Sequence, residues 1–468
     1  MTSMTLKTFG LAFGVLVAGL APAGAETLAD AMAKAYANNP TLAAERAGLR
    51  ALNEDEVQER AAGLGAANAS ASYGYTTSES GASVRPRSRD DTDPFSLGVS
   101  GSLNLYDGGR TYNGTRSAQA AVSSGESNLT STEQDVLLAA VTAYEDVRRD
   151  IALVGVSRSN VRVISEQLRA AQDRFEVGEV TRTDVSQAEA RLAAARSTLA
   201  AATGSLARSR QAYLVAIGEL PEDLTQPPPL PDLPATEGEA IALAEAAHPL
   251  LVAARYDVQQ AEYEVKRALG GMLPTVDLEG DLSYTDGGLL IENSVTDGNS
   301  ASVGVRASVP LWSGGRNPSL VREAQARLAQ RQALIHAIGR QVRQQVSNAW
   351  SGLEVSRISI PAARQQIRAA QIAFDGVKEE ATLGARTTLN VLDADQELQL
   401  ARAELYRSLR DEYVAGYTLL SAVGSLTVSH LGLDVARYDP EAYPTEVERV
   451  PNGWYQDESV KWSNRYRP

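Results

Sequence analysis

The residues of this chain whose side chains are best suited to chemistry lie in a polar segment between two predicted helices. Residues 383–396 read LGARTTLNVLDADQ, which combines an arginine, two threonines and closely spaced acids. Thr387 and Asn390 can cap the helix that follows, and Asp393 lies in its first turn, where the helix dipole stabilises a carboxylate. The phrase therefore predicts a capped turn, and its acids are candidates for a site that attracts cations.

Other side chains give little support for catalysis or metal binding. Asp277, Glu279 and Asp281 share one face of a predicted strand, which indicates a hydrated acidic wall more simply than a catalytic pair of carboxylates. The acids at 90–93 lack the full spacing of a calcium loop. The chain has no cysteine and only three histidines, far apart in sequence, so thiolate chemistry is excluded. We therefore expect no enzyme activity, no metal and no cofactor.

Composition and charge exclude a further class. The formal net charge of -14 and an isoelectric point near 4.9 argue against nucleic-acid binding, because no basic stripe offsets the acids. The chain is 43% hydrophobic, yet it has only five Phe and four Trp. Cores built from small residues favour narrow seams between helices over one thick globular interior.

The N-terminus predicts export. Residues 1–25 contain Lys7, an apolar stretch from Phe9 to Leu20 and a small-residue end, which is typical of a signal peptide cleaved before Glu26. The alternative, an N-terminal membrane helix, needs a longer apolar run. No later run reaches about 18 apolar residues, so no later membrane-spanning helix is expected.

The chain is internally duplicated. LYDGGRTYNGTRSAQA at 105–120 resembles LWSGGRNPSLVREAQA at 311–326, and the same shift of 206 residues aligns 177–196 with 383–402. One shift that serves two separated segments makes chance an unsatisfactory explanation.

The duplication sets the domain boundaries. We expect a first repeat over 26–220, a proline-rich linker over 221–235, a second repeat over 236–425 and a C-terminal extension over 426–468 that is equatorial or disordered. Each repeat should contain a helix, a β-hairpin and two long helices.

Hydrophobic periodicity places a hairpin of strands about ten residues long in each repeat. Apolar and polar residues alternate within the hairpins at about 69–105 and 275–311. Such strands fit the wall of a membrane barrel, and they also fit a half-buried sheet on a soluble core. Four strands cannot close a barrel, so several chains would have to share one.

Long helical patterns occupy 109–218 and 315–424, with small apolar residues that recur every three or four positions. The stripes are narrow and favour coiled coils. Gly178 and Gly384 interrupt them where the chain must reverse, because glycine adopts the left-handed conformation of a helix end. A soluble coiled-coil rod would explain the helices but not the hairpins.

The signal peptide, the duplicated plan, the paired GGR turns and the phrase GARTTLNVLDA resemble the TolC family of outer-membrane efflux and secretion proteins, over roughly residues 26–425. The resemblance implies a mixed α/β membrane protein: a homotrimer with a twelve-stranded barrel, four strands per chain, in the outer membrane, continuous with a helical tunnel in the periplasm. It also implies contact with outer-membrane lipid, a periplasmic adaptor and an inner-membrane ABC transporter or other pump.

The resemblance places Asp393 and Asn390 at the periplasmic mouth of the tunnel, where the family carries rings of acids. Three copies of Asp393 would focus negative potential there. Position 390 holds asparagine instead of the usual aspartate, so we expect one acidic ring rather than two.

The resemblance also places Arg386 opposite Thr183 and Asp184, where a charge-assisted contact would latch one helix pair to its neighbour. The alternative is a solvated arginine of little energetic value. Ala381 stands where many family members carry a tyrosine that strengthens this latch, so a looser latch is expected.

The C-terminal extension, with its YDP phrase, resembles that of family members in type I protein secretion. Type I secretion is therefore the first hypothesis, and the multidrug efflux channel is the second. A periplasmic coiled-coil scaffold without a pore is a distant third. The cargo and the identity of the pump are not encoded in any recognisable motif.

Overall fold

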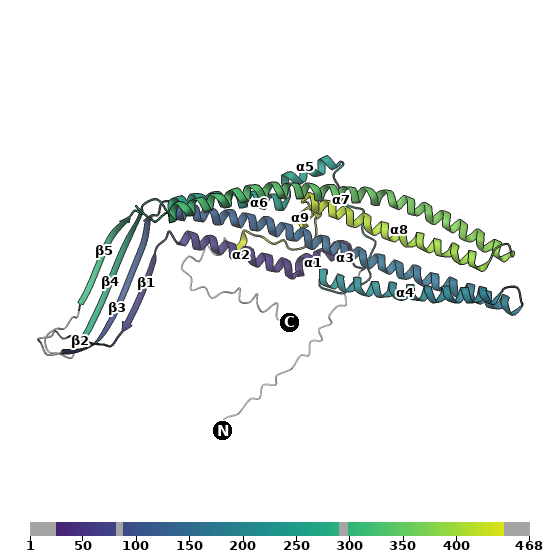
Figure 1. Ribbon diagram of the computed structural model, residues 1–468, viewed down its shortest axis with the longest axis horizontal. Coiled ribbons are helices and arrows are strands. Elements are labelled where there is room, and N and C mark those ends of the chain that lie inside the picture. The colour runs from purple at the N-terminus through teal and green to yellow at the C-terminus, as the bar shows by residue number, and fades with distance from the viewer. Residues whose placement is uncertain (1–24, 81–87, 290–297, 444–468) are drawn as a thin grey trace, which may run out of the picture.

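The structure, a computed structural model, describes residues 25–80, 88–289 and 298–443. It is an elongated molecule with a β-sheet at one end and a long helical body that ends in two helical tips (Figure 1). The predicted signal peptide, apart from Ala25, lies outside the described residues, as does the tail from 444 onward.

The two repeats contain helices of equal length. They are α1 (Leu28–Asn38) with α5 (Glu237–Ala247), α2 (Pro40–Ala61) with α6 (Pro249–Gly270), α3 (Arg110–Glu176) with α7 (Arg316–Thr382), and α4 (Arg182–Ile217) with α8 (Thr388–Val423). The lengths are 11, 22, 67 and 36 residues in each repeat. The single helix expected before each hairpin is wrong, because Asn39 and His248 end one helix and cap a second.

The helices α3 and α7 form the backbone of the body. Each has 67 residues, about 100 Å of helix, and reaches from the sheet to a tip (Figure 1). Near the sheet α2 packs on α3 and α6 packs on both α3 and α7, whereas toward the tips α4 packs on α3 and α8 packs on α7 and α3. A Cβ at Gly424, just past α8, would lie 2.9 Å from the Cα of His248. The end of α8 therefore abuts the start of α6.

The strands of both repeats form one antiparallel sheet. These are β1 (Ala66–Tyr73), β2 (Thr76–Ser80), β3 (Ser88–Tyr106), β4 (Thr275–Leu289) and β5 (Gly298–Ser308). The order is β1-β3-β4-β5, with β2 also paired to β3, so the repeats meet at β3 and β4. The hairpins begin at 66 rather than 69 and end at 308 rather than 311, and β3 extends to 19 residues, well beyond the expected ten.

The register collects polar and apolar residues on opposite faces of the sheet. Residues directly opposite each other share a face. The polar face includes these cross-strand pairs: Asn68 with Ser100, Ser100 with Asp281, Asp281 with Ser302, Ser102 with Glu279, Asn104 with Asp277, and Asp277 with Arg306.

The apolar face of the sheet is exposed. Val99 pairs with Leu282, and their side chains are 51% and 59% exposed, while Val303 on β5 is 84% exposed. A sheet packed on a soluble core would bury these residues, so that alternative does not fit the described chain.

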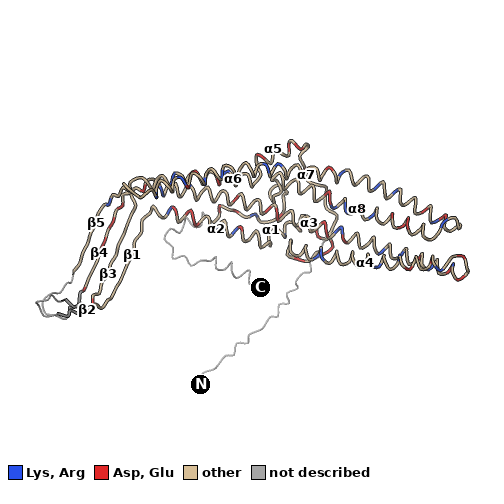
Figure 2. The backbone as a smooth tube through the Cα atoms, in the orientation of Figure 1, with Lys and Arg blue, Asp and Glu red and all other residues tan. Residues whose placement is uncertain are grey.

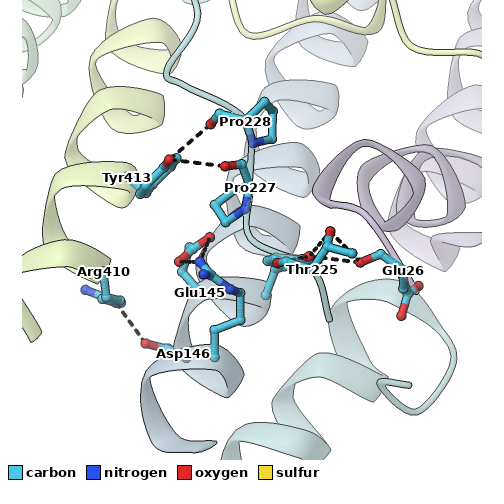
Figure 3. Close-up of polar contacts among 10 residues, drawn as sticks. Glu26, Glu145, Asp146, Thr225, Pro227, Pro228, Arg410 and Tyr413 are labelled. Carbon is cyan, nitrogen blue, oxygen red and sulfur yellow. Dashed lines mark hydrogen bonds and ion pairs between the residues drawn. The ribbon is translucent and has the colours of Figure 1, made fainter. Parts of the chain in front are cut away.

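The proline-rich linker is a strap that contacts helices of both repeats, and Figure 3 shows Thr225, Pro227 and Pro228 of this strap with their polar partners. The buried hydroxyl of Tyr144, on α3, donates to the carbonyl oxygens of Glu26 and Thr225 at 2.9 and 2.8 Å. The hydroxyl of Tyr413, on α8, lies 3.1 Å from the carbonyl oxygen of Pro228. The strap thus joins both repeats at the level where the helices abut.

The described part of the C-terminal extension packs back on the first repeat. The short helix α9 (Val428–Leu431) is anchored by a hydrogen bond from its first amide to Glu133 at 2.7 Å. Farther along, the Arg46 guanidinium lies 4.7 Å from the ring centre of Tyr36 and 5.3 Å from that of Tyr438. This part of the extension therefore contacts α2 and α3 of the first repeat.

Within the described ranges, every helix is too short or too polar to cross a membrane. Along the described helices, Lys and Arg are interspersed with Asp and Glu, including near the tips (Figure 2).

Candidate functional site

The two helix tips reverse the chain with the same geometry. Gly178 and Gly384 have φ angles of 80° and 77°, in the left-handed region that glycine tolerates best. At each tip the next amide bonds back to a carbonyl five residues earlier: Glu179 to Arg174 at 2.9 Å and Ala385 to Glu380 at 2.9 Å. These are Schellman-type helix ends.

Each returning helix begins with a capping box. The Asp184 carboxylate accepts from the amide and hydroxyl of Thr181, at 2.9 and 2.7 Å, and these hydrogen bonds lower the pKa of Asp184. Asn390, 206 residues later, accepts from the amide and hydroxyl of Thr387 at 3.2 and 2.8 Å. Asn390 thus takes the place of Asp184 without the charge. Thr183 is exposed in the same first turn.

Arg386 is paired inside its own tip. Its guanidinium lies 2.7 Å from the Glu380 carboxylate, and both side chains are half exposed. The contact predicted between Arg386 and Thr183 or Asp184 would join two helix pairs. Within this one chain Arg386 binds Glu380 and Asp184 binds Thr181, so a contact across subunits stays a prediction.

Asp393 has a partner that sequence reasoning missed. The Arg191 guanidinium, on α4, lies 2.6 Å from an Asp393 carboxylate oxygen and 2.5 Å from the amide oxygen of Gln396. Asp393 is 52% exposed and Arg191 is 38% exposed. The spacing of apolar residues along α4 could have indicated this contact. Arg191 lies between Ala188 and Leu192 of the apolar stripe, so its side chain borders the interface between helices.

The neighbour of Asp393 is buried between the repeats. Leu392 is 2% exposed and packs with Ile164 on α3 and with Ala188, Leu192 and Ala195 on α4. At the tip itself, the Arg174 guanidinium on α3 lies 3.5 Å from the carbonyl oxygen of Ala381 on α7. The two helix pairs therefore meet within one chain, through a small apolar cluster flanked by arginines.

Asp395, one of the acids in the phrase at 383–396, faces inward rather than toward the solvent. It is 2% exposed, and Gln399 donates to one of its carboxylate oxygens at 3.0 Å. Burial raises the pKa of Asp395. Its other oxygen has no hydrogen-bond partner in the described part of the chain. Asp395 therefore belongs to the helix seam.

Comparison with known proteins identifies the family. The family model described as "Outer membrane efflux protein" matches residues 31–219 and 240–425. The chain is 36% identical over 453 residues to the outer membrane efflux protein BepC of Brucella suis biovar 1 (strain 1330), covering 95% of this chain and 97% of BepC. It is 28% identical over 330 residues to the alkaline protease secretion protein AprF of Pseudomonas aeruginosa, covering 69% and 67% of the two chains.

Solved structures show the same fold. The Campylobacter jejuni CmeC outer membrane channel superposes with a TM-score of 0.76 at 16% identity, covering 92% of this chain and 90% of that one. The open state of the Neisseria gonorrhoeae MtrE outer membrane channel gives 0.68 at 19% identity, covering 86% and 89%. The mixed α/β fold with an internal repeat, the outer-membrane location and the exclusion of enzymes are confirmed. The chain belongs to the outer membrane efflux protein family.

Proposed function

We propose that three copies of this chain form the outer-membrane exit duct of a type I secretion system. The sheet carries this proposal, because one face is polar, the other is apolar and exposed, and the outer strands β1 and β5 each pair with one side only among the described residues. Open edges in lipid are prohibitively costly, and three four-stranded sheets close into a barrel of twelve strands.

The helices extend that barrel into the periplasm, toward an adaptor protein and an inner-membrane ABC transporter. The tips form its periplasmic end, with Asp393 from each chain around the opening and Asn390 as an uncharged neighbour. The Arg386 latch to Thr183 and Asp184 of an adjacent helix pair completes this proposal. The latch keeps the duct closed until the pump docks.

Two observations support protein secretion as the task. The extension carries Tyr438, Asp439 and Pro440, the YDP phrase, and the chain is similar to AprF and to the proteases secretion protein PrtF of Dickeya chrysanthemi, at 28% identity over 262 residues. Multidrug efflux is a second candidate because the similarity to the efflux protein BepC is higher and covers nearly the whole chain.

A deletion of the gene separates the two tasks. Loss of particular proteins from the culture medium, with unchanged susceptibility to dyes and detergents, is expected for type I secretion. The reverse pattern would assign the chain to efflux. Restoration by the wild-type gene is the control.

Conductance in a planar bilayer tests the duct itself. The mature wild-type protein should form a small pore that a trivalent cation blocks, and Asp393→Ala should remove that block, because a narrow ring of carboxylates concentrates cations. The absence of any channel in both proteins would contradict the duct and favour a coiled-coil scaffold without a pore.

A further inference from the structure

The paired GGR turns stand where the sheet passes into the helical body. Arg110 is the first residue of α3 and Arg316 is the first residue of α7, so each repeat contributes one of them. The end of α6 packs beside the start of α7 at this level, and the strands continue on the other side of it (Figure 1). In the proposed duct, on which this inference rests, this level is the boundary between lipid and periplasm.

A groove with excess positive charge runs from this boundary along α6 and α7. Five arginines and three acids line it, although the chain as a whole has a formal net charge of -14. Three of the arginines lie at the helix ends nearest the sheet: Arg110 on α3, Arg267 on α6 and Arg316 on α7. Such a cluster attracts anions.

The three helix ends are packed against one another. A Cβ on Gly270, the last residue of α6, would lie 2.8 Å from the Cγ of Arg110. The side-chain amide of Asn317 donates to the carbonyl oxygen of Gly271 at 3.0 Å, which fixes the start of α7 against the same end of α6. The arginines therefore approach the groove from three elements in direct contact.

The arginines of the groove differ in whether their charge is already balanced. Farther from the sheet, Arg327 and Arg331 are paired with carboxylates of the groove at 2.5 and 3.2 Å. Arg267 lies 3.0 Å from the Glu59 carboxylate. In the part of the chain that the structure describes, the Arg316 side chain makes no hydrogen bond or ion pair. The uncompensated charge is therefore at the start of α7.

The two repeats differ at the residue before each GG pair. In the first repeat the Asp107 carboxylate accepts from the amide of Thr111 at 2.6 Å, so α3 has an internal anion at its start. Ser313, 206 residues later, accepts from the amide of Asn317 at 3.3 Å and brings no charge. A cation at the first residue of a helix is unfavourable, because the helix dipole is positive there. The start of α7 therefore lacks a negative charge that the start of α3 has.

Exposed apolar side chains lie near the same end of the groove. Leu269, Met272 and Leu273, at the end of α6 and just after it, are exposed. Trp312, shortly before α7, is also exposed, and tryptophan is enriched where lipid meets water. A free phosphate ion would use the arginines alone. A phospholipid offers a phosphate to the arginines and acyl chains to the apolar side chains.

We propose that this groove binds the phosphate of an anionic phospholipid in the periplasm-facing leaflet, through Arg316 together with Arg110 and Arg267. The acyl chains of the lipid contact the exposed apolar side chains beside the groove. The bound lipid supplies to the second repeat the negative charge that Asp107 supplies to the first. An anionic lipid is favoured over a zwitterionic one, because the groove carries more arginines than acids.

Lipid titration of the purified mature protein in detergent tests the site, with bound lipids counted by native mass spectrometry. Phosphatidylglycerol should bind more tightly than phosphatidylcholine. Arg316→Gln should weaken the apparent affinity for phosphatidylglycerol roughly fivefold, and Arg110→Gln with Arg316→Gln roughly twentyfold. Arg322→Gln is the matched control, because Arg322 is an exposed arginine of the same helix that does not line the groove. Its affinity should equal that of wild type.

A substitution that copies the first repeat tests the site without removing an arginine. Ser313→Asp gives α7 the carboxylate that α3 has in Asp107, and it should weaken phosphatidylglycerol binding roughly fivefold. Because aspartate also caps a helix start, the melting temperature without added lipid should not fall. Reduced lipid binding in a protein of undiminished stability therefore separates the site from a folding defect.

Three results would overturn the lipid site. The first is wild-type affinity for phosphatidylglycerol in both Arg316→Gln and Ser313→Asp. The second is equal affinity for phosphatidylcholine, and the third is inorganic phosphate that raises the melting temperature as much as phosphatidylglycerol does, which would indicate a site for a free anion. A protein that conducts normally but shows one of these results loses only the lipid site. One that binds phosphatidylglycerol through Arg316 but forms no channel contradicts the duct instead.

Discussion

Asp184 and Asn390 perform the same structural task with different charge. Each is the third residue of its helix and accepts hydrogen bonds from the N-cap threonine just before that helix, Thr181 or Thr387. The two positions are related by the internal repeat. We expect Asp184→Asn to preserve the cap, because Asn390 shows that an amide oxygen suffices. Asp184→Ala removes the two hydrogen bonds that the carboxylate accepts from Thr181 and should destabilise the first turn by about 0.5–2 kcal/mol.

Hydrogen exchange of the amides at 181–188 is the measurement for this cap. Faster exchange is expected in Asp184→Ala and wild-type rates in Asp184→Asn. Equal rates in all three proteins would show that the capping box has no energetic weight. Because the pKa of Asp184 is lowered in the folded chain, its charge-dependent contribution is present at neutral pH and is lost as the pH falls through the folded pKa.

His248 is the second residue with a pH-dependent role. It is 5% exposed, and its Nδ1 accepts from the amide of Leu250 at 3.2 Å, which requires a neutral ring. Burial lowers the pKa of His248, so its stabilising effect is present above the ordinary value near 6.5 and is lost as the pH falls through the folded pKa. Asn39 makes the corresponding cap in the first repeat, with its amide oxygen 2.8 Å from the Thr41 nitrogen.

Thermal melting of wild type and His248→Asn between pH 8 and pH 5 tests this role. The wild-type melting temperature should fall more on acidification, because asparagine caps without titrating. Asp135 lines the same cavity, and burial raises its pKa, so its contribution has the opposite sign. Only the difference between the two proteins isolates His248. Parallel curves would contradict the assignment.

At the scale of elements, the local structure could be predicted from the sequence, but the contacts between the two repeats could not. Gly178 and Gly384 mark both reversals because each needs a positive φ, and the alternation around Leu97 and Val303 predicts strands because side chains point to opposite faces in turn. Neither signal reports which strand lies beside which.

Contacts between distant segments required the structure. Leu97 lies opposite Tyr284, and Arg191 meets Asp393 across 202 residues of chain. No period connects such positions, and a single sequence offers no other guide to them. The break at Asn39 was missed for a different reason, since the residue that ends α1 also caps α2 and leaves no loop.

Two tyrosine hydroxyls hold the strap, together with the backbone hydrogen bonds that join Glu26 to Asp223 and Thr225. Tyr144 is fully buried, and Tyr144→Phe would leave the carbonyl oxygens of Glu26 and Thr225 without their shared donor. We expect the free energy of unfolding to fall by about 1–3 kcal/mol, and proteolysis within 221–235 to become faster. Tyr406→Phe, at a tyrosine that is 38% exposed, is the control and should change neither. Equal proteolysis of all three proteins would mean that the strap is held by its prolines and leucines alone.

The surface of the whole molecule suits two different environments, water and lipid. Along the helical body, charges of both signs alternate, as suits a surface bathed in water (Figure 2). On the sheet one face is polar and the other is apolar, and the apolar face is exposed over all four strand positions of the order β1-β3-β4-β5. The exposed apolar area of the isolated chain therefore indicates lipid outside the sheet and water inside the barrel.

A matched pair of arginine substitutions on β5 tests this division. Val303 belongs to the apolar face and is 84% exposed, whereas Ser302 pairs with Asp281 on the polar face. Val303→Arg places a charge in the hydrocarbon region and should cost about 2–4 kcal/mol near the bilayer midplane. Ser302→Arg places the same charge in water beside an acidic residue. We expect Val303→Arg to deplete the outer-membrane fraction and its heat-modifiable trimers, and Ser302→Arg to leave both at wild-type levels. Equal depletion by the two variants would show that the sheet does not present its apolar face to lipid.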